Sequence, residues 1–256
     1  MNIINSELER LHSHRFALEI IHSVPELRNL WLQIEKSILS ISDDELMETF
    51  TSINAKKKKG KNKSLAPAIN FLLDKRLRDL DWIPQSDIFT SIEIVGSMVE
   101  ANLDQVSDED DGLYSVETSR DRGRNSTWTL DFSKSVSLPD GKKTGMAVEV
   151  AFNHAEAAAW NLVKPVIASE INDARVKTNI GEGIGVVIVA SAGMKYSGNF
   201  DGATGDFRRY LKTLNAMRSQ LTSPILLVPL DAPESFHIQR KSKKQGVSIE
   251  GTIKMH

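Results

Sequence analysis

Two carboxylates in consecutive apolar segments are the residues of this sequence best suited to do chemistry. Asp131 stands in the run Leu-Asp-Phe and Glu149 in the run Val-Glu-Val. Both segments, residues 127–134 and 145–152, have the β-branched and aromatic content of buried strands. Burying two carboxylates without a cation costs several kcal/mol or raises their pKa values. Oxygen ligands on adjacent strands suit Mg²⁺, so the pattern indicates a metal site.

A surface role is the alternative for these acids. A strand can carry a carboxylate on its solvated face, where Asp131 would pair with Lys134 or with an arginine of residues 120–124. The order of the elements favours the metal site, because the two acids close a strand–hairpin–strand unit that runs directly into a helix.

The elements before the acids are expected to be helical. Ser-x-x-Glu patterns at residues 23–26 and 42–45 match capping boxes, which predict helices from about Pro25 and about Asp43. Apolar residues between them recur at helical spacing and indicate a buried stripe. The basic run at residues 56–63 has no such periodicity and predicts a loop, either solvated or in contact with phosphate.

The elements after the acids alternate between helix and strand. A helix at residues 154–172 should be kinked or divided by Pro165, because proline removes a backbone donor. Polar residues 103–126 predict loops over the cleft, and glycines at 194–205 predict an irregular segment. The remaining elements are a strand at 184–190, a helix at 206–221 and a strand at 224–230. This order predicts an α/β fold with a mixed central sheet and helices on both faces.

These features together resemble a known family. Asp on one strand, Glu-Val-x-Phe at residues 149–152 on the next, and then a helix resemble the PD-(D/E)XK nucleases, specifically the BglII, BstYI and BamHI group of type II restriction endonucleases. Residues 12–42 are similar to the opening helices of that group, residues 64–82 to its next helix, and residues 223–230 to its last core strand. The resemblance implies a restriction-endonuclease-like single domain over residues 1–256, with a mainly helical part at 1–82 and a catalytic α/β core at 83–256.

The resemblance also implies the ligands of the metal. Asp131 and Glu149 would hold Mg²⁺ with the main-chain carbonyl of Val150, and the expected activity is hydrolysis of phosphodiester bonds in double-stranded DNA. One branch of the group uses a further acid upstream of the aspartate. Glu117 and Glu100 are candidates for it, with ordinary surface positions as the alternative.

Ala151 departs from the family pattern at a catalytic position. The family places Glu, Gln or Lys there to orient the attacking water, and a methyl group can neither donate nor accept a hydrogen bond. Three explanations stay open. Another residue such as Asn153, His154 or Lys134 positions the water, the sequence is a variant inactivated at this position, or the protein binds DNA without cutting it.

Two segments are expected to contact DNA. Asn153 and His154 stand at the start of the helix that the family places near the DNA groove, although Asn153 is also an ordinary N-cap and His154 could be a general base or a plain helix-start residue. The glycine-rich loop at 195–206 offers donors and acceptors on Lys195, Ser197, Asn199 and Asp201. A short palindromic site predicts a homodimer, with the 154–172 helix near its two-fold axis.

Composition is compatible with this hypothesis. A formal net charge of −2 does not indicate a nucleic-acid-binding protein, but a single basic face is enough to bind DNA. The absence of cysteine excludes thiolate catalysis and disulfides, and no apolar run is long enough to span a membrane, so a cytoplasmic bacterial protein is expected. A non-cleaving DNA-binding protein and a small-molecule α/β enzyme are the alternatives. The second lacks a Gly-rich phosphate loop after its first strand and a GxSxG elbow.

Overall fold

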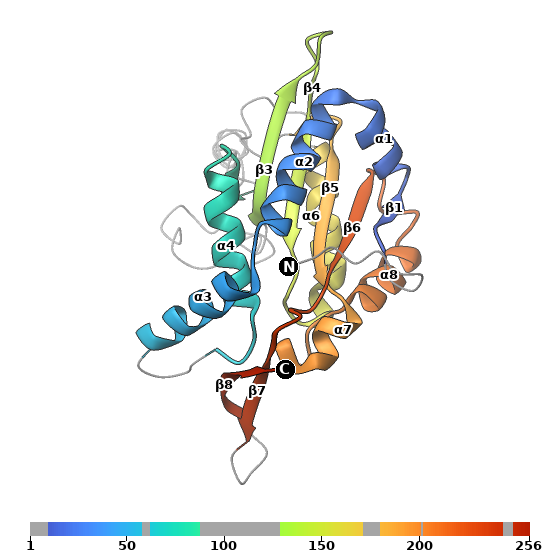
Figure 1. Cartoon of the computed structure of the whole chain (residues 1–256). Coiled ribbons are helices and arrows are strands. Elements are labelled where there is room, and N and C mark those ends of the chain that lie inside the picture. The colour runs from blue at the N-terminus through green and yellow to red at the C-terminus, as the bar shows by residue number, and fades with distance from the viewer. Residues whose placement is uncertain (1–9, 58–61, 88–128, 171–179, 201, 243–247) are drawn as a thin grey trace, which may run out of the picture.

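A six-stranded mixed sheet forms the centre of the computed structural model (Figure 1). The structure describes residues 10–57, 62–87, 129–170, 180–200, 202–242 and 248–256. The strand order is β1-β6-β5-β4-β3-β2. The three central strands β4, β5 and β6 are parallel, and β1, β2 and β3 are antiparallel to their neighbours.

Four of the six strands lie within about three residues of the predicted ranges, and β1 and β2 were not predicted as strands. They are β1 (His12–His14), β2 (Ile83–Asp87), β3 (Thr129–Ser137), β4 (Lys143–Val150), β5 (Ile184–Ala190) and β6 (Ile225–Leu230). Every residue of β5 and β6 is buried, as expected for central parallel strands covered on both faces. The mixed α/β fold predicted from the sequence is therefore confirmed.

Four helices from the first part of the chain lie on one side of the sheet. They are α1 (Ala17–Ser23), α2 (Pro25–Leu39), α3 (Asp43–Lys56) and α4 (Ala66–Arg78). The cap predicted at Ser42 is present, because its side chain accepts a hydrogen bond from the Glu45 amide. The cap predicted at Ser23 is wrong. Ser23 ends α1 and its hydroxyl donates to the carbonyl of Glu19, so α2 starts after Val24 without a side-chain cap.

The first described element also differs from the prediction. Residues 12–14 were expected to belong to the opening helices, but they form the edge strand β1, which pairs with β6. His14 is buried there, and its Nε2 lies 2.9 Å from the carbonyl oxygen of Leu221.

Two helices, α6 (Ala158–Glu170) and α8 (Phe207–Ala216), cover the opposite face. Pro165 does not divide α6, which continues from Ala158 to Glu170. A Cβ added at Gly185 would lie 2.6 Å from the Pro165 Cβ, so the proline packs on the sheet where β5 has no side chain. The prediction was that Pro165 kinks or divides this helix, and a division is therefore wrong. Helix α8 begins at the N-cap Asp206 as predicted but ends five residues earlier than expected, at Ala216.

Two short helical turns lie at the start of the segment that was predicted to be irregular, residues 194–205. These are α7 (Ala192–Met194) and η3 (Lys195–Asn199), and a positive φ at Gly198 interrupts the second. A separate hairpin of β7 (Phe236–Ser242) and β8 (Ser248–Met255) packs beside them at the lower end of Figure 1. Its Ile238 amide donates to the Asn199 side chain, so the hairpin and the turn support each other.

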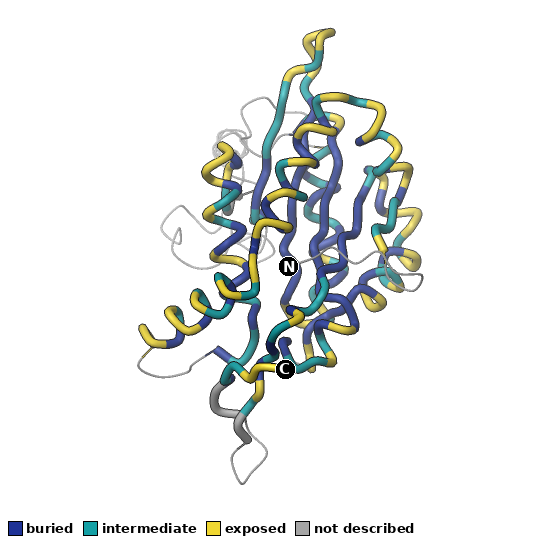
Figure 2. Tube along the Cα trace, viewed as in Figure 1, coloured by how far each residue is buried: buried dark blue, intermediate teal, exposed yellow. Residues whose placement is uncertain are grey.

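The core has one large cluster on each face of the sheet and a third, smaller one around Leu130 and Ala147. Figure 2 shows the buried central strands between more exposed helices. One cluster joins the N-terminal helices to Val148 and Val150, and the other joins α6 and α8 to Ala151 and Val187. No helix in the described residues is long and apolar enough to cross a membrane.

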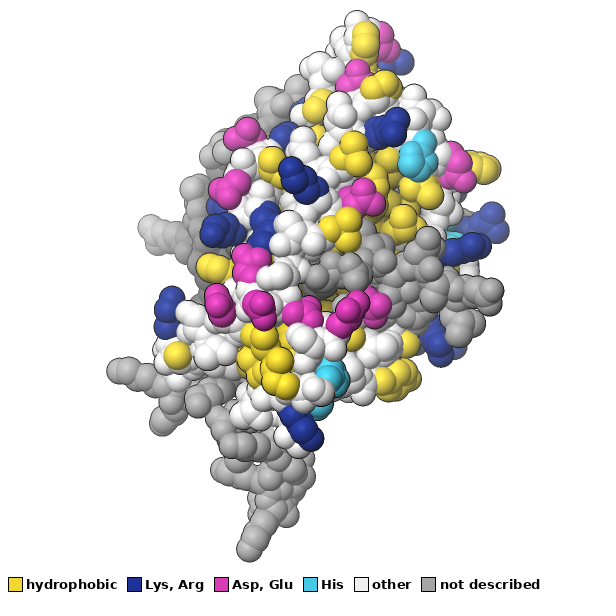
Figure 3. Space-filling view, viewed as in Figure 1, with side chains coloured by type: hydrophobic (Ala, Val, Ile, Leu, Met, Phe, Trp, Pro, Cys, Tyr) yellow, Lys and Arg dark blue, Asp and Glu magenta, His cyan; other side chains and the backbone are white. Residues whose placement is uncertain are grey.

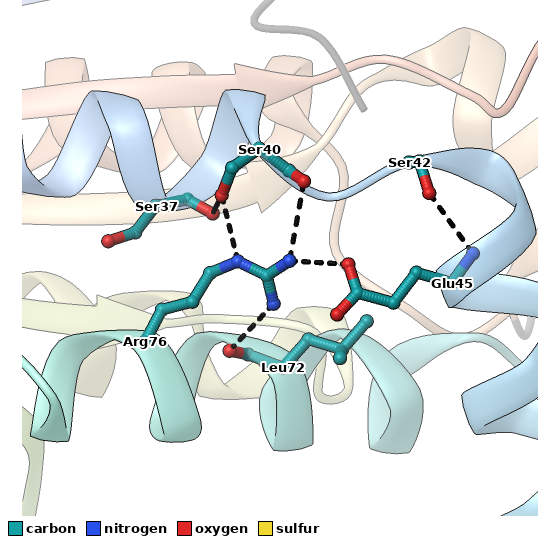
Figure 4. A network of polar contacts seen from close by, with 6 residues as sticks. All are labelled: Ser37, Ser40, Ser42, Glu45, Leu72 and Arg76. Atoms are coloured by element: carbon teal, nitrogen blue, oxygen red, sulfur yellow. Dashed lines mark hydrogen bonds and ion pairs between the residues drawn. The ribbon is translucent and has the colours of Figure 1, made fainter.

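Arg76 fixes α4 to the helices beside it (Figure 4). Its guanidinium donates to the hydroxyl and the carbonyl of Ser40 at the end of α2, and it forms an ion pair with Glu45 in the first turn of α3. It also donates to the Leu72 carbonyl within α4. Three helix segments are thereby joined by one partly buried cation, and α4 is held in position beside β3.

Candidate active site

The two predicted carboxylates lie together at the ends of β3 and β4. The pairing of β3 with β4 ends at Phe132 and Val148, so Asp131 and Glu149 each lie one residue beyond it. The Val150 amide donates to Oδ2 of Asp131 over 2.7 Å. The Asp131 side chain thus binds the backbone of the strand that carries Glu149, and the two acids are held as a pair.

Glu149 is buried more deeply than Asp131. Asp131 is partly exposed, whereas Glu149 is only 2% exposed. Burial, followed by repulsion from Asp131, raises the pKa of Glu149 from 4.5 to about 8. Burial also raises the pKa of Asp131. A pair of carboxylates that is costly to ionise is one that a cation would stabilise.

Lys164 of α6 is the cation that the structure places at this pair. Its Nζ lies 2.9 Å from Oε2 of Glu149, and its side chain is only 14% exposed. Lys164 opposes the rise in the pKa of both acids, but burial prevails for each of them. The other carboxylate oxygen of Glu149, Oε1, is buried without a hydrogen-bond partner. An unpaired buried acceptor of this kind indicates a missing ligand such as a metal ion or water.

A pocket of about 310 Å³ opens beside Asp131. Helix α4 provides one side of it and the ends of β3 and β4 the other. Its lining residues are Pro67, Asn70, Phe71, Asp74, Arg78, Asp131, Phe132 and Val150. Asp74 and Arg78 form an ion pair of 2.7 Å across one helical turn.

The pocket therefore contains an upstream acid, Asp74, that was not predicted. The two upstream candidates from the sequence, Glu100 and Glu117, lie outside the described residues. Asp74, Asp131 and Glu149 do not form a complete metal-binding cluster, and no group of three acidic or histidine side chains within the described ranges does so.

Ala151 is buried in the core. It is 1% exposed, belongs to the same apolar cluster as Ala158 and Leu162 of α6, and its amide donates to the carbonyl of Ile188. The structure thus explains the small side chain, because α6 packs over this position. A longer polar residue would have to displace part of that packing.

Two of the three alternatives named for positioning water, Lys134 and Asn153, have side-chain contacts elsewhere. Lys134 donates to the carbonyl of Leu80 and lies 3.4 Å from the side chain of Gln33 on α2. The carbonyl oxygen of the Asn153 side chain accepts a hydrogen bond of 2.8 Å from Asn161. His154 is exposed, and its backbone bridges to Thr204.

The two segments predicted to contact DNA lie side by side. The Gly205 amide donates to the Asn153 carbonyl, the Ala155 amide donates to the Ala203 carbonyl, and a backbone bridge joins His154 to Thr204. The start of the α6 region and the end of the glycine-rich loop therefore form one surface. Asn153 and His154 are both exposed on it.

Within the 195–206 loop, the predicted side chains mostly turn inward. Asn199 is fully buried and binds the Ile238 amide, Ser197 donates to the Met194 carbonyl, and Lys195 lies 3.6 Å from Asp206. In this arrangement Asn199 supports the hairpin instead of offering its amide to DNA. Asp201 lies outside the described residues. The residue that η3 exposes most is Tyr196, at 78%, which the sequence pattern did not single out.

Charge does not identify the DNA face in the view of Figure 3. Among the described residues seen there, acidic side chains form a row near the start of α3, and lysines and arginines are scattered around it. Of the predicted basic loop, Lys57 is described and donates to the Asn62 side chain, while residues 58–61 are outside the description.

A weak signal for Lys164 was present in the sequence. It is a lone cation in the run Leu-Val-Lys-Pro-Val, inside a helix that must pack on the strand of a buried acid. For Asn70, Asp74 and Arg78 the only signal is their spacing along one face of α4. That spacing gives no indication that the face turns toward β3.

Comparisons with known proteins bear on the fold and the family of this chain. No curated protein sequence matches the chain. The structure of BglII described as "restriction endonuclease BGLII complexed with DNA 16-mer" is 14% identical, with a TM-score of 0.53 over the whole of both chains. The structure described as "free BglII" is 13% identical, with a TM-score of 0.42 over the same coverage. The first likeness shows the restriction-endonuclease fold.

The match to a family model assigns the family more firmly than the structural likeness does. A family model described as "Restriction endonuclease BglII/BglIII" matches residues 10–230, which include β3, β4 and both carboxylates. This match speaks against the small-molecule enzyme considered above. The chain therefore belongs to the BglII/BglIII family of restriction endonucleases.

Proposed function

We propose that this protein is a Mg²⁺-dependent type II restriction endonuclease of the PD-(D/E)XK type, which hydrolyses phosphodiester bonds at a short palindromic site in double-stranded DNA. The observation that carries the proposal is the pair of Asp131, which lines an open pocket, and the buried Glu149 behind it, in a chain of a restriction endonuclease family. Burying two carboxylates whose pKa values are raised costs folding free energy. That cost would have no explanation if the pair served packing alone.

The residues present fit a magnesium ion. Asp131 offers a partly exposed carboxylate at the pocket, and Glu149 offers the unpartnered Oε1. With the carbonyl of Val150 they would form an all-oxygen set that leaves room for waters, as Mg²⁺ prefers. Bound there, the ion would lower the pKa of a water and neutralise charge on the phosphate.

The residues of the chain prepare this site before any ion binds. The Val150 amide fixes Asp131 against β4, which sets the separation of the two carboxylates. Helix α4 forms one wall of the pocket that Asp131 lines, and it brings the Asp74–Arg78 pair to the same pocket. The contacts of Arg76 with Ser40 and Glu45 hold α4 in this position.

DNA recognition is assigned to the surface at residues 153–155 and 203–205. Its exposed Asn153 and His154 can donate and accept hydrogen bonds at base edges, and Lys195 and Tyr196 lie in the neighbouring turn. A palindrome presents the same base edges twice about a two-fold axis. We therefore expect a homodimer that places one active site on each half-site.

A non-cleaving DNA-binding protein on the same fold is the second candidate. One observation favours it, namely the buried Ala151 at the position where related enzymes carry a polar residue. The two functions differ in one measurable outcome, because only the nuclease converts supercoiled plasmid into nicked or linear DNA.

The test is a nicking and cutting assay on supercoiled plasmids and phage DNA, with Mg²⁺, with Ca²⁺ and with EDTA. The nuclease proposal expects cleavage in Mg²⁺ alone, and loss of that cleavage in Glu149→Ala with DNA binding retained in Ca²⁺. Specific binding without cleavage by the wild-type protein would establish the second candidate instead.

A further inference from the structure

An active site of the proposed kind needs a polar group that holds the attacking water, and position 151 does not provide one. The Ala151 side chain has no donor or acceptor, and α6 packs over it. The same helix that closes off position 151 brings in Lys164. The polar group has therefore to be sought on α6 and not on β4.

Lys164 meets the geometric requirements for that group. Its ammonium lies 2.9 Å from Oε2 of Glu149, and its side chain is largely shielded from water. An ammonium has three N–H donors, and the contact with Glu149 uses one of them. Among the described residues the other two donors have no partner, so they can bind a water or a phosphate oxygen beside the carboxylate pair.

Buried packing holds the ammonium in place. Leu162 and Val166 flank Lys164 on α6 and lie in the core cluster of that face, and Pro165 seats the helix on β5 at Gly185. A second polar contact positions the start of the helix. Asn161 donates both to Asn153 and to the hydroxyl of Tyr210, at 2.8 and 2.7 Å. The lysine is therefore presented by a rigid element, which is what preorganised catalysis requires.

We propose that Lys164 is a catalytic residue that replaces the missing polar side chain at position 151, by donating hydrogen bonds to the attacking water and to the phosphate oxygen that gains charge. This inference rests on the proposed nuclease function. In the reaction the water oxygen forms a bond to phosphorus while the bond from phosphorus to the leaving O3′ breaks. The proton released by the water goes to solvent, and the O3′ takes a proton from solvent.

The competing role for Lys164 is that of a counter-ion. In that role it neutralises Glu149 only while no metal is bound, and it does nothing during the reaction. The two roles predict opposite results for removal of the amine. A counter-ion that competes with the metal can be removed without slowing cleavage, whereas a donor to the reacting atoms cannot.

The experiment compares wild-type protein with Lys164→Met, Lys164→Gln and the control Lys212→Met, an exposed lysine on α8. Single-turnover cleavage is measured on a plasmid that the wild-type protein cuts, at saturating protein and saturating Mg²⁺. Ca²⁺ binding by calorimetry, plasmid binding in Ca²⁺ and the thermal unfolding midpoint are measured on the same preparations.

Lys164→Met should lower the single-turnover rate about 100-fold or more, as the loss of one preorganised donor does. Its affinities for Ca²⁺ and for plasmid should stay within about threefold of wild type. Lys164→Gln should cleave about tenfold faster than Lys164→Met, because its amide can still donate to water. Lys212→Met should match the wild type in every measurement.

An unchanged rate in a folded Lys164→Met protein would overturn the inference, as would a rate that higher Mg²⁺ restores completely. If Lys164→Met fails to fold, Lys164→Gln decides, because wild-type rates in that variant also contradict a role for the ammonium charge. Wild-type protein that cuts no DNA would overturn the proposed function itself, a result distinct from either outcome for Lys164.

Discussion

Neutralising Glu149 by substitution should stabilise the metal-free protein at neutral and alkaline pH. Burial raises the pKa of Glu149 from 4.5 to about 8, so the folded protein keeps a proton there that the unfolded chain has lost. Between these two values the folded state binds more protons than the unfolded state. Its free energy of unfolding must therefore fall as the pH rises, and the loss stops above pH 8.

The magnitude follows from the linkage relation. One retained proton lowers the free energy of unfolding by about 1.4 kcal/mol for each pH unit within this window. Between pH 5.5 and pH 7.5 the wild-type protein should lose about 3 kcal/mol through this residue alone. Glu149→Gln removes the titration, so this contribution is absent from the variant.

Urea unfolding in EDTA at several pH values between 5.5 and 8.5 measures the difference between the two proteins. Other groups titrate in both proteins and cancel in the comparison, apart from Asp131, whose raised pKa is partly due to the same environment. We expect the stability advantage of Glu149→Gln to grow steadily with pH and to level off near pH 8. Parallel stability curves for the two proteins would refute the argument that Glu149 is costly to ionise.

Three further predictions follow from the site. Asp131→Asn should lower Mg²⁺-dependent cleavage by about 100-fold or more while plasmid binding in Ca²⁺ persists, and wild-type cleavage by this variant would contradict the metal assignment. Ala151→Gln should lower the free energy of unfolding by about 1–3 kcal/mol in urea, because α6 packs over this position; a gain in both stability and rate would show that the site has room for a polar side chain. Arg76→Met should cost about 1–3 kcal/mol in the same assay, with the exposed Lys75→Met as control, and equal stability of the two variants would show that the Arg76 contacts contribute little.

The sequence was sufficient for the elements whose signals are local. The strands that carry Asp131 and Glu149 are apolar runs with one acid each, and the fully buried β5 is a continuous apolar run. The N-cap Ser42 could be read because a cap depends on residues a single turn apart. In each case the deciding interactions lie within a few residues of one another.

The features that sequence did not predict depend on distant contacts. The strand at His12–His14 has three residues, too few for a periodic pattern, and it exists because β6 offers an unpaired edge. Pro165 stays within one helix because Gly185, twenty residues later, makes room for it. Lys164 meets Glu149 only because the crossover from β4 to β5 lays α6 back over the sheet. The same is true of Asp74, which lines the same pocket as Asp131 because of the position of α4.

The most direct test of the account is to map the ends that wild-type protein produces on phage DNA in Mg²⁺, with Glu149→Ala in parallel. All ends from the wild-type protein should fall at one short palindromic sequence, at positions related by its two-fold axis, and the variant should produce none. Ends scattered without a common sequence, or the same ends from the variant, would contradict an active site built on Asp131 and Glu149.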